Sequence, residues 1–390
     1  MRIVAAASAK PGMRLGRPVF DADGRLILAA GTTLRQRYID LLVEQGFSSL
    51  YIADDLAQVE LPEIITVETR QEVIRCIMDF VGTGAISKGI GPVKGFSPGA
   101  SAGPDFLFGN KVAHRPNPDL ASKVTRVARM LVDEVVSQRD VVIGLVDIKS
   151  LRDYTYAHSV QVALIATTAG KVLGFNKKEL LDLGIGALLH DVGKTVVPDY
   201  VWSKTEQLTT EEWEQVKMHS VAGFEFIRRT EVGLMPAHVA FQHHERWNGT
   251  GYPRGLKGEQ IIKLARVCAV ADVFDAITSD RPYKAALHPS NALEFIAKGS
   301  GTLFEPSSVD AVRAVVAPYP VATNVRLSTG DIAVVKKINT LELDRPVVVV
   351  IKDRNRKFYK VHRELDLSVD RDISIVDYVT WYDESGVADG

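Results

Sequence analysis

The chain has 390 residues, of which 24% are charged and 46% hydrophobic, and its formal net charge is −1. This length exceeds one ordinary domain, so two or three domains are expected, and the hydrophobic content is sufficient for a buried core. The near-zero net charge excludes a global electrostatic attraction to DNA, RNA or an acidic membrane, so recognition of any anionic ligand has to be local.

Three further features of the sequence indicate a cytoplasmic protein without a membrane partner. Cys76 and Cys268 are too few and too far apart for a disulfide framework, which fits a reducing compartment. No apolar stretch approaches the ~20 residues needed to span a bilayer. The apolar run before Lys10 is also too short for a convincing signal peptide.

Residues 1–81 are predicted to form a small N-terminal α+β module. Residues 18–20 and 25–28 are rich in β-formers and flank a turn, which predicts a hairpin. Thr33 is expected to cap a helix that ends at Gly46, and residues 50–52 resume strand character. This module carries no recognisable chemistry, so a structural, dimerisation or regulatory role is expected.

The middle of the chain changes character twice. Glycine and proline recur every few positions in residues 82–118, which predicts a linker because this composition supports neither helix nor strand. Helical periodicity then begins near Leu120 and persists to about Val316, with apolar residues spaced along one helical face. We therefore predict a helical bundle over residues 119–318.

Beyond Pro318 the pattern changes to strands. Residues 332–335, 346–351 and 357–361 are β-rich, and the strand pattern extends to Tyr378. Residues 319–390 are predicted to be a small C-terminal β appendage, again without recognisable chemistry. The expected fold class is multidomain and mainly α, with a helical-bundle core between the N-terminal module and this appendage.

Five of the nine histidines lie with aspartates in ordered blocks of the predicted bundle. The blocks read YAHS at 156–159, LHDVGK at 189–194, MHS at 218–220, HHERWNGTGYP at 243–253 and VADVFD at 270–275. Imidazoles and carboxylates gathered in this way suit first-row transition metals, and two adjacent metals suit phosphoester hydrolysis. Facing helices and their connecting loops can place such ligands in the core of a bundle.

One pair of neighbours suggests how two metals could be held together. On a helix, His190 and Asp191 would diverge by about 100°. The imidazole could then take one metal while the carboxylate reaches between two cations roughly 3.5–4 Å apart. Each histidine taken alone is more often structural than a ligand, so the ordered set carries the assignment. The histidines without such support are expected to be structural: His114, His238, His288 and His362.

These blocks resemble the HD-GYP family, a bacterial branch of the HD phosphohydrolase superfamily, over about residues 154–303. The most specific part runs from His243 to Lys284 and contains the Gly-Tyr-Pro loop. The resemblance implies two divalent metal ions, with iron or manganese favoured over magnesium. The implied ligands are His158, His190, Asp191 and Asp272 for one metal, and Asp191, His219, His243 and His244 for the other.

The resemblance also implies an activity, the hydrolysis of cyclic di-GMP to pGpG or GMP by a two-metal-activated hydroxide. Asp191 and Lys194 are the implied catalytic residues, with Lys194 placing a cation on the scissile phosphate. The implied substrate-binding residues are Lys194, Gly251, Tyr252, Pro253, Asp275, Arg281 and Lys284. Contacts of the Gly-Tyr-Pro loop with GGDEF-domain proteins are implied as well, and the N-terminal module resembles a domain of unknown function often fused to this family.

The sequence departs from the family pattern at a few positions. Tyr154 stands where some members place a glutamate that helps to bind a third metal, so a two-metal site is predicted. Asn248 replaces a common aspartate, and Ile262 replaces a common proline. No implied ligand of the two-metal site is missing, and the site is expected to be competent.

Two alternatives to a cyclic di-GMP phosphodiesterase stay open. The same motifs would serve an enzyme that hydrolyses 3′,3′-cyclic GMP-AMP. They would also serve a receptor that binds a cyclic dinucleotide and turns it over slowly or not at all. The expected partners are therefore a cyclic dinucleotide, GGDEF-domain proteins and a second copy of the chain.

Overall fold

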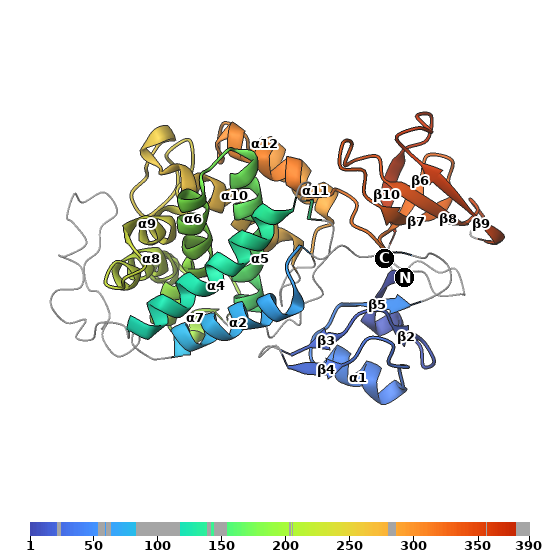
Figure 1. The fold of residues 1–390 in the computed structure, drawn as a ribbon, viewed down its shortest axis with the longest axis horizontal. Helices are drawn as coiled ribbons and strands as arrows, with labels where there is room; N and C mark the ends of the chain where they lie inside the picture. The colour runs from blue at the N-terminus through green and yellow to red at the C-terminus, as the bar shows by residue number, and fades with distance from the viewer. Residues whose placement is uncertain are drawn as a thin grey trace.

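The computed structural model describes residues 1–379 except 22–24, 54–58, 60–63, 83–117, 139–141, 144–153, 203, 205, 280–285 and 356. A helical bundle forms one body, and the N-terminal module and the C-terminal sheet lie together on one side of it (Figure 1). The predicted fold class is therefore confirmed. The core of the predicted linker, residues 83–117, lies outside the described residues.

Within its described residues, the N-terminal module contains two small antiparallel sheets and one α-helix. Its elements are β1 (Arg2–Ala5), β2 (Arg14–Leu15), β3 (Val19–Phe20), β4 (Leu26–Leu28), α1 (Gln36–Glu44) and β5 (Ser49–Ala53). β3 pairs with β4, which confirms the predicted hairpin, and β5 lies between β1 and β2. The predicted helix cap at Thr33 is wrong, because Thr33 forms an antiparallel bridge with Arg14 and the helix begins only at Gln36.

The bundle is built around two helices that are buried along most of their length, α5 and α6. Its helices are α2 (Val67–Gly82), α4 (Pro118–Ser137), α5 (Tyr154–Val172), α6 (Lys177–Leu189), α7 (Asp199–Trp202), α8 (Thr210–Ile227), α9 (Leu234–Gln242), α10 (Lys263–Thr278), α11 (Pro289–Lys298) and α12 (Pro306–Val315). α6 packs against α4, α5 and α9, while α5 also contacts α10 and α12 (Figure 1). A helix that is apolar nearly all round is stable only when other helices cover it, which explains this arrangement.

Helix α2 packs with the bundle, although the predicted module included it. Val73 and Phe80 belong to the same apolar core as the residues of α4, and the Phe80 ring meets Phe226 of α8 edge-on at 5.2 Å. Thr69 donates a hydrogen bond to Glu134 of α4. The domain boundaries at 81, 118 and 318 stay predictions, and this packing favours placing residues 64–82 with the bundle.

The C-terminal appendage is a five-stranded antiparallel sheet in the order β10-β6-β7-β8-β9. Its strands are β6 (Asn324–Leu327), β7 (Ile332–Lys337), β8 (Val347–Lys352), β9 (Phe358–Asp366) and β10 (Ile375–Tyr378). The predicted strands are confirmed, and β6 is an addition. The backbone N–H of Ile3 donates to the carbonyl of Ala322 at 3.0 Å, so the first strand of the chain is joined to the appendage. Among the described residues, none of the helices is both long and apolar enough to cross a membrane.

Candidate metal centre

Five helices carry the predicted ligands into one buried cluster. The positions are His158 on α5, His190 and Asp191 directly after α6, His219 on α8, His243 and His244 directly after α9, and Asp272 on α10. All are buried except His244, whose side chain stays partly accessible. Residues that are 114 positions apart thus share one site, because α5 packs directly against α10.

The donor atoms divide into two sets with a carboxylate between them. In the first set, His158, His190 and Asp272 have ligand atoms within 4.8 Å of one another, and His219, His243 and His244 form a second set by the same measure. These sets correspond to the two metals that the sequence implies. The structure therefore brings together every residue of the predicted ligand list.

Asp191 lies between the two sets. Its Oδ2 atom is 3.2 Å from Nε2 of His190, and its Oδ1 atom is 3.6 Å from Nε2 of His219. One carboxylate thus faces an imidazole of each set, as a bridge between two cations requires. The predicted helical divergence is not how this is achieved, because Asp191 leaves the helix: its φ and ψ are −98° and 3°, whereas His190 keeps −55° and −36°.

Hydrogen bonds at Nδ1, the ring nitrogen that faces away from the centre of the site, orient three of the imidazoles. Three rings use Nδ1 to contact a backbone carbonyl three residues earlier: His190 to Ala187 at 2.7 Å, His219 to Val216 at 2.6 Å and His243 to Ala240 at 2.8 Å. A carbonyl only accepts, so Nδ1 carries the proton and Nε2 keeps its lone pair toward the centre of the site. Nε2 of His190 is buried without a hydrogen-bond partner among the described residues, and a cation would satisfy it.

The protonation states also suit a metal ion. Burial lowers the pKa of His219 to about 4 and lowers that of His243 as well, so both rings are neutral at pH 7. Burial opposes ionisation of Asp272, but its contacts with His158, His190 and His244 together outweigh burial and lower the pKa of Asp272. Neutral imidazoles and ionised carboxylates are the donors that divalent transition metals take, so the residues fit such an ion.

His190 differs from the other rings. Burial alone would lower its pKa, but the carboxylates of Asp191 and Asp272 and the carbonyl of Ala187 together outweigh burial and raise it. The contact with His190, together with the charge of Lys194, lowers the pKa of Asp191 despite its burial. A cation that binds between these two residues therefore competes with a proton.

Lys194 lies beside the carboxylate of Asp191, on the short helix η3 (Val192–Val196). Its Nζ atom is 2.5 Å from Oδ2 of Asp191. Close packing holds this segment against α8, since a Cβ atom at Gly193 would lie 1.9 Å from the carbonyl oxygen of His219. Only glycine allows this approach, which brings Asp191 and Lys194 up to the second histidine set.

The Gly-Tyr-Pro loop packs against the same set. A Cβ atom at Gly251 would lie 2.3 Å from the backbone nitrogen of Arg246, so the loop requires glycine there. The N–H of Tyr252 donates to the carbonyl of His244 at 3.1 Å, and the two rings lie 4.7 Å apart at 31°. Pro253 follows through a cis peptide bond. The loop thus forms part of the wall of the site.

A buried carboxylate that sequence reasoning did not single out supports this loop. Glu245 accepts hydrogen bonds from the backbone N–H groups of Arg254 at 2.8 Å and Leu256 at 2.9 Å. Its place directly after the two histidines was visible, but its partners depend on how the loop folds back. Ile262, which replaces a common proline, uses the N–H that proline lacks to bond Gln242 at 2.8 Å.

Two tryptophans also border the site without having been predicted. The ring of Trp202 on α7 lies 6.4 Å from that of His219, and the ring of Trp213 on α8 lies 6.0 Å from that of Tyr252. No motif or spacing in the sequence marks them. Among the predicted substrate residues, Arg281 and Lys284 lie outside the described residues, as does the side chain of Tyr154.

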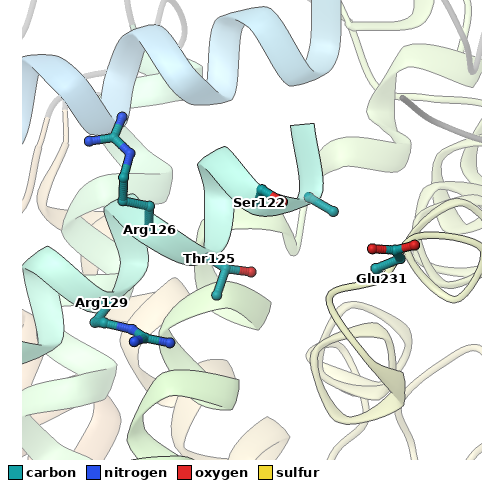
Figure 2. Close-up of a pocket in the computed structure, with 6 residues that line it drawn as sticks. Ser122, Thr125, Arg126, Arg129 and Glu231 are labelled. Atoms are coloured by element: carbon teal, nitrogen blue, oxygen red, sulfur yellow. The ribbon is translucent and has the colours of Figure 1, made fainter. Parts of the chain in front are cut away.

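A separate hollow of about 360 Å³ lies on the surface of α4. It is lined by Ala121, Ser122, Thr125, Arg126, Arg129 and Glu231. Glu231 faces the α4 side chains from across the hollow (Figure 2). Arg126 is paired with Glu72 of α2 at 2.5 Å, and none of the lining residues belongs to the metal centre.

Comparisons with known proteins agree with this geometry. A family model described as HD domain matches residues 141–307, which include all the predicted metal ligands. Cyclic di-GMP phosphodiesterase PA4108 of Pseudomonas aeruginosa is 37% identical over 248 residues, which are 62% of this chain and 60% of that protein. The cyclic di-GMP phosphodiesterase response regulator RpfG of Xanthomonas campestris is 40% identical over 163 residues, or 40% of this chain and 42% of that protein.

A further relative carries a different name. The 3′3′-cGAMP-specific phosphodiesterase 3 of Vibrio cholerae is 33% identical over 169 residues, or 43% of this chain and 36% of that protein. Among solved structures, the HDG"Y"P protein Bd1817 from Bdellovibrio bacteriovorus aligns over 80% of this chain and 97% of its own, with TM-score 0.49 and 16% identity. The chain spans less than two thirds of the length of these curated relatives. Residues 141–307 thus match the HD domain model, and over part of its length the chain is similar to proteins named as cyclic di-GMP phosphodiesterases.

Proposed function

We propose that this chain is a metal-dependent phosphodiesterase that hydrolyses cyclic di-GMP to pGpG, to GMP or to both. The observation that carries the proposal is the position of Asp191, whose two carboxylate oxygens face imidazoles of two separate histidine sets. The names of the relatives support the substrate class.

The donor set supports two divalent cations, and we propose iron or manganese. His158, His190 and Asp272 would hold one, His219, His243 and His244 would hold the other, and Asp191 would contact both. When bound, the cations would lower the pKa of a water molecule and polarise the phosphodiester oxygens. Rings whose Nδ1 atoms are already engaged need little reorganisation to accept them.

Lys194 and Asp191 would lie beside the phosphodiester group that is cleaved. The oxygen of water adds to phosphorus, the bond from phosphorus to the 3′ oxygen breaks, and that oxygen takes up a proton. Lys194 is partly exposed beside Asp191, so its ammonium group can offset the negative charge that develops on the phosphate oxygens. The pairing with Asp191 holds this cation at the site until substrate arrives.

The remaining substrate residues are assigned by position. Gly251, Tyr252 and Pro253 would shape the wall next to His244. Asp275 is hydrogen-bonded to Nδ1 of His158 at 2.7 Å, so we assign it to orienting that ring. Arg281 and Lys284 are proposed to hold the phosphate and guanine edges, as the family resemblance implies.

The test is anaerobic purification with iron or manganese, followed by chromatographic analysis of products from cyclic di-GMP. Metal-dependent formation of pGpG or GMP, abolished in Asp191→Ala, is the expected result. Full activity of the Asp191→Ala variant, or no product from protein with two metals bound, would reject the proposal.

Two alternatives are distinguished in the same experiment. Cyclic GMP-AMP is assayed in parallel because relatives that are 33% identical are named as phosphodiesterases for it. Tight binding without turnover would indicate a receptor. GGDEF-domain partners, a homodimer and a cytoplasmic location stay predictions.

A further inference from the structure

Exposed aromatic side chains surround one half of the metal centre. Trp202 and Trp213 are 37% and 44% exposed, although Trp202 lies next to the buried imidazole of His219. The ring of Trp202 is 6.4 Å from that of His219. On the other flank, Trp213 meets Tyr252 at 6.0 Å, and Tyr252 in turn lies 4.7 Å from His244. The two indoles therefore border the same histidine set from different helices.

The indole of Trp202 is held in place by the segment that carries the bridging carboxylate. Its Nε1 atom donates to the carbonyl of Lys194 at 3.4 Å. The ammonium group of Lys194, which pairs with Asp191, lies 5.1 Å from the centre of the same ring. A cation over an aromatic face is attracted to it, so the ring is oriented even though part of it reaches solvent.

Such exposure is costly for a side chain that serves only packing. A large apolar ring gains stability from burial, and exposed aromatic groups that gather beside a polar site are typical of binding surfaces. A cyclic dinucleotide presents two flat purines on a compact ring of phosphates and sugars. If a phosphodiester reaches the metal centre, the purines extend to its rim, where the indoles lie.

We infer that Trp202 and Trp213 form a nucleobase-binding surface, in which each indole stacks on a purine base of the cyclic dinucleotide. The inference rests on the proposed function for the identity of the ligand. Stacking positions the substrate so that its phosphodiester lies beside Asp191 and Lys194. Guanine and adenine both have a π-face, so this surface accepts cyclic di-GMP and cyclic GMP-AMP alike. Discrimination between the two dinucleotides must come from groups that form hydrogen bonds with the edges of the bases.

The test compares Trp202→Leu and Trp213→Leu with wild type, using metal-loaded protein and both cyclic dinucleotides. Trp202→Phe and Trp213→Phe keep an aromatic face. Phe295→Leu is the control, because Phe295 is a 46%-exposed aromatic on α11 outside the site. Metal content and thermal unfolding are measured for every variant. A second measurement is the quenching of tryptophan fluorescence when cyclic di-GMP is added to metal-free protein.

Each leucine variant is expected to raise KM roughly 5- to 100-fold for both dinucleotides, with kcat and metal content little changed. The phenylalanine variants should restore most of the loss, and Phe295→Leu should behave as wild type. Values of KM within twofold of wild type in both leucine variants would overturn the inference, and so would a fall in kcat that follows loss of metal.

The fluorescence measurement tests this inference independently of the proposed function. If wild-type protein hydrolyses neither dinucleotide, the phosphodiesterase proposal fails, but quenching that is lost in Trp202→Leu still supports the aromatic surface. If wild-type protein is active, but neither leucine substitution changes the fluorescence quenching or the KM, only the inference fails.

Discussion

Asp275 accepts a hydrogen bond from Nδ1 of His158 at 2.7 Å, across 117 positions of sequence. The opposite nitrogen of the same ring, Nε2, lies 3.1 Å from Oδ1 of Asp272. One turn of α10 thus supplies a carboxylate to each side of the imidazole. Backbone carbonyls orient His190, His219 and His243, so His158 differs from them in relying on a side chain.

This relationship predicts that Asp275→Ala weakens the metal centre without removing a ligand. The ring of His158 loses its acceptor, so metal affinity should fall by roughly 10- to 100-fold, as for other groups that orient metal-bound histidines. Competition with a chelator measures this change. Asp310→Ala, at an exposed position on α12, is the control and should leave affinity unaltered. Equal affinities in the two variants would contradict the assigned role.

Removal of the bridging carboxylate should have a larger effect. Asp191→Asn keeps the shape of the side chain but loses the negative charge that faces both histidine sets. We expect bound metal to fall from two ions to one or none, and hydrolysis to fall by more than roughly 100-fold. Metal analysis of the purified variant, with rates measured at saturating metal, checks both effects. Retention of two ions would show that Asp191 does not bridge.

Lys194→Met should separate catalysis from metal binding. The ammonium group contacts Asp191 and is proposed to act on the phosphate, and Lys194 is not among the proposed metal ligands. We expect kcat to fall by roughly 100- to 1,000-fold, the usual loss for one electrostatic group in a transition state, with metal content retained. A rise in KM alone would instead assign Lys194 to substrate binding.

Gly193→Ala tests the packing that brings η3 to α8. Its Cβ atom would lie 1.9 Å from the carbonyl oxygen of His219, so the two segments must separate. Overpacking of this kind should lower the free energy of unfolding by about 1–3 kcal/mol and reduce metal binding. Gly223→Ala is the matched control, since its nearest neighbour would be at 3.5 Å. Denaturant unfolding of both variants measures the difference.

Because the imidazole of His288 is buried, we predict that the free energy of unfolding falls in mild acid. Burial lowers its pKa to about 4, and its ring stacks on Tyr378 of β10 at 4.2 Å. Below its ordinary pKa of about 6.5 the unfolded chain binds a proton that the folded protein excludes. Stability is therefore lost as pH falls from about 6.5 toward 4, by up to about 3 kcal/mol.

Thermal unfolding of His288→Asn at pH 7 and pH 5 tests this assignment. Asparagine can still cap α11, as His288 does by accepting from the N–H of Ser290, but it neither stacks nor titrates in this range. The variant should be less stable at pH 7 and should lose less stability between the two pH values. An unchanged pH dependence would exclude His288 as the titrating group.

The sequence by itself determined the ligand types, their order and the fold class. Imidazoles and carboxylates are recognised as candidate metal ligands from residue type alone, and the spacing of apolar residues distinguishes helices from strands. The helices of the bundle and the strands β7 and β8 were predicted from this spacing. A prediction from neighbouring residues was wrong where a contact with a more distant residue formed instead. Thr33 was predicted to cap α1, but it pairs with Arg14.

Only the tertiary structure decided how those ligands meet and what surrounds them. Asp191 faces both histidine sets because the chain leaves α6 there and Gly193 lets the next segment approach α8. The sequence places Asp275 three residues after Asp272, but it reaches His158 only because α5 packs against α10, and the exposure of Trp202 and Trp213 has no local pattern. The physical reason is that each depends on which helices pack together, and packing is set by burial summed over the whole bundle, not by the residues nearby in sequence.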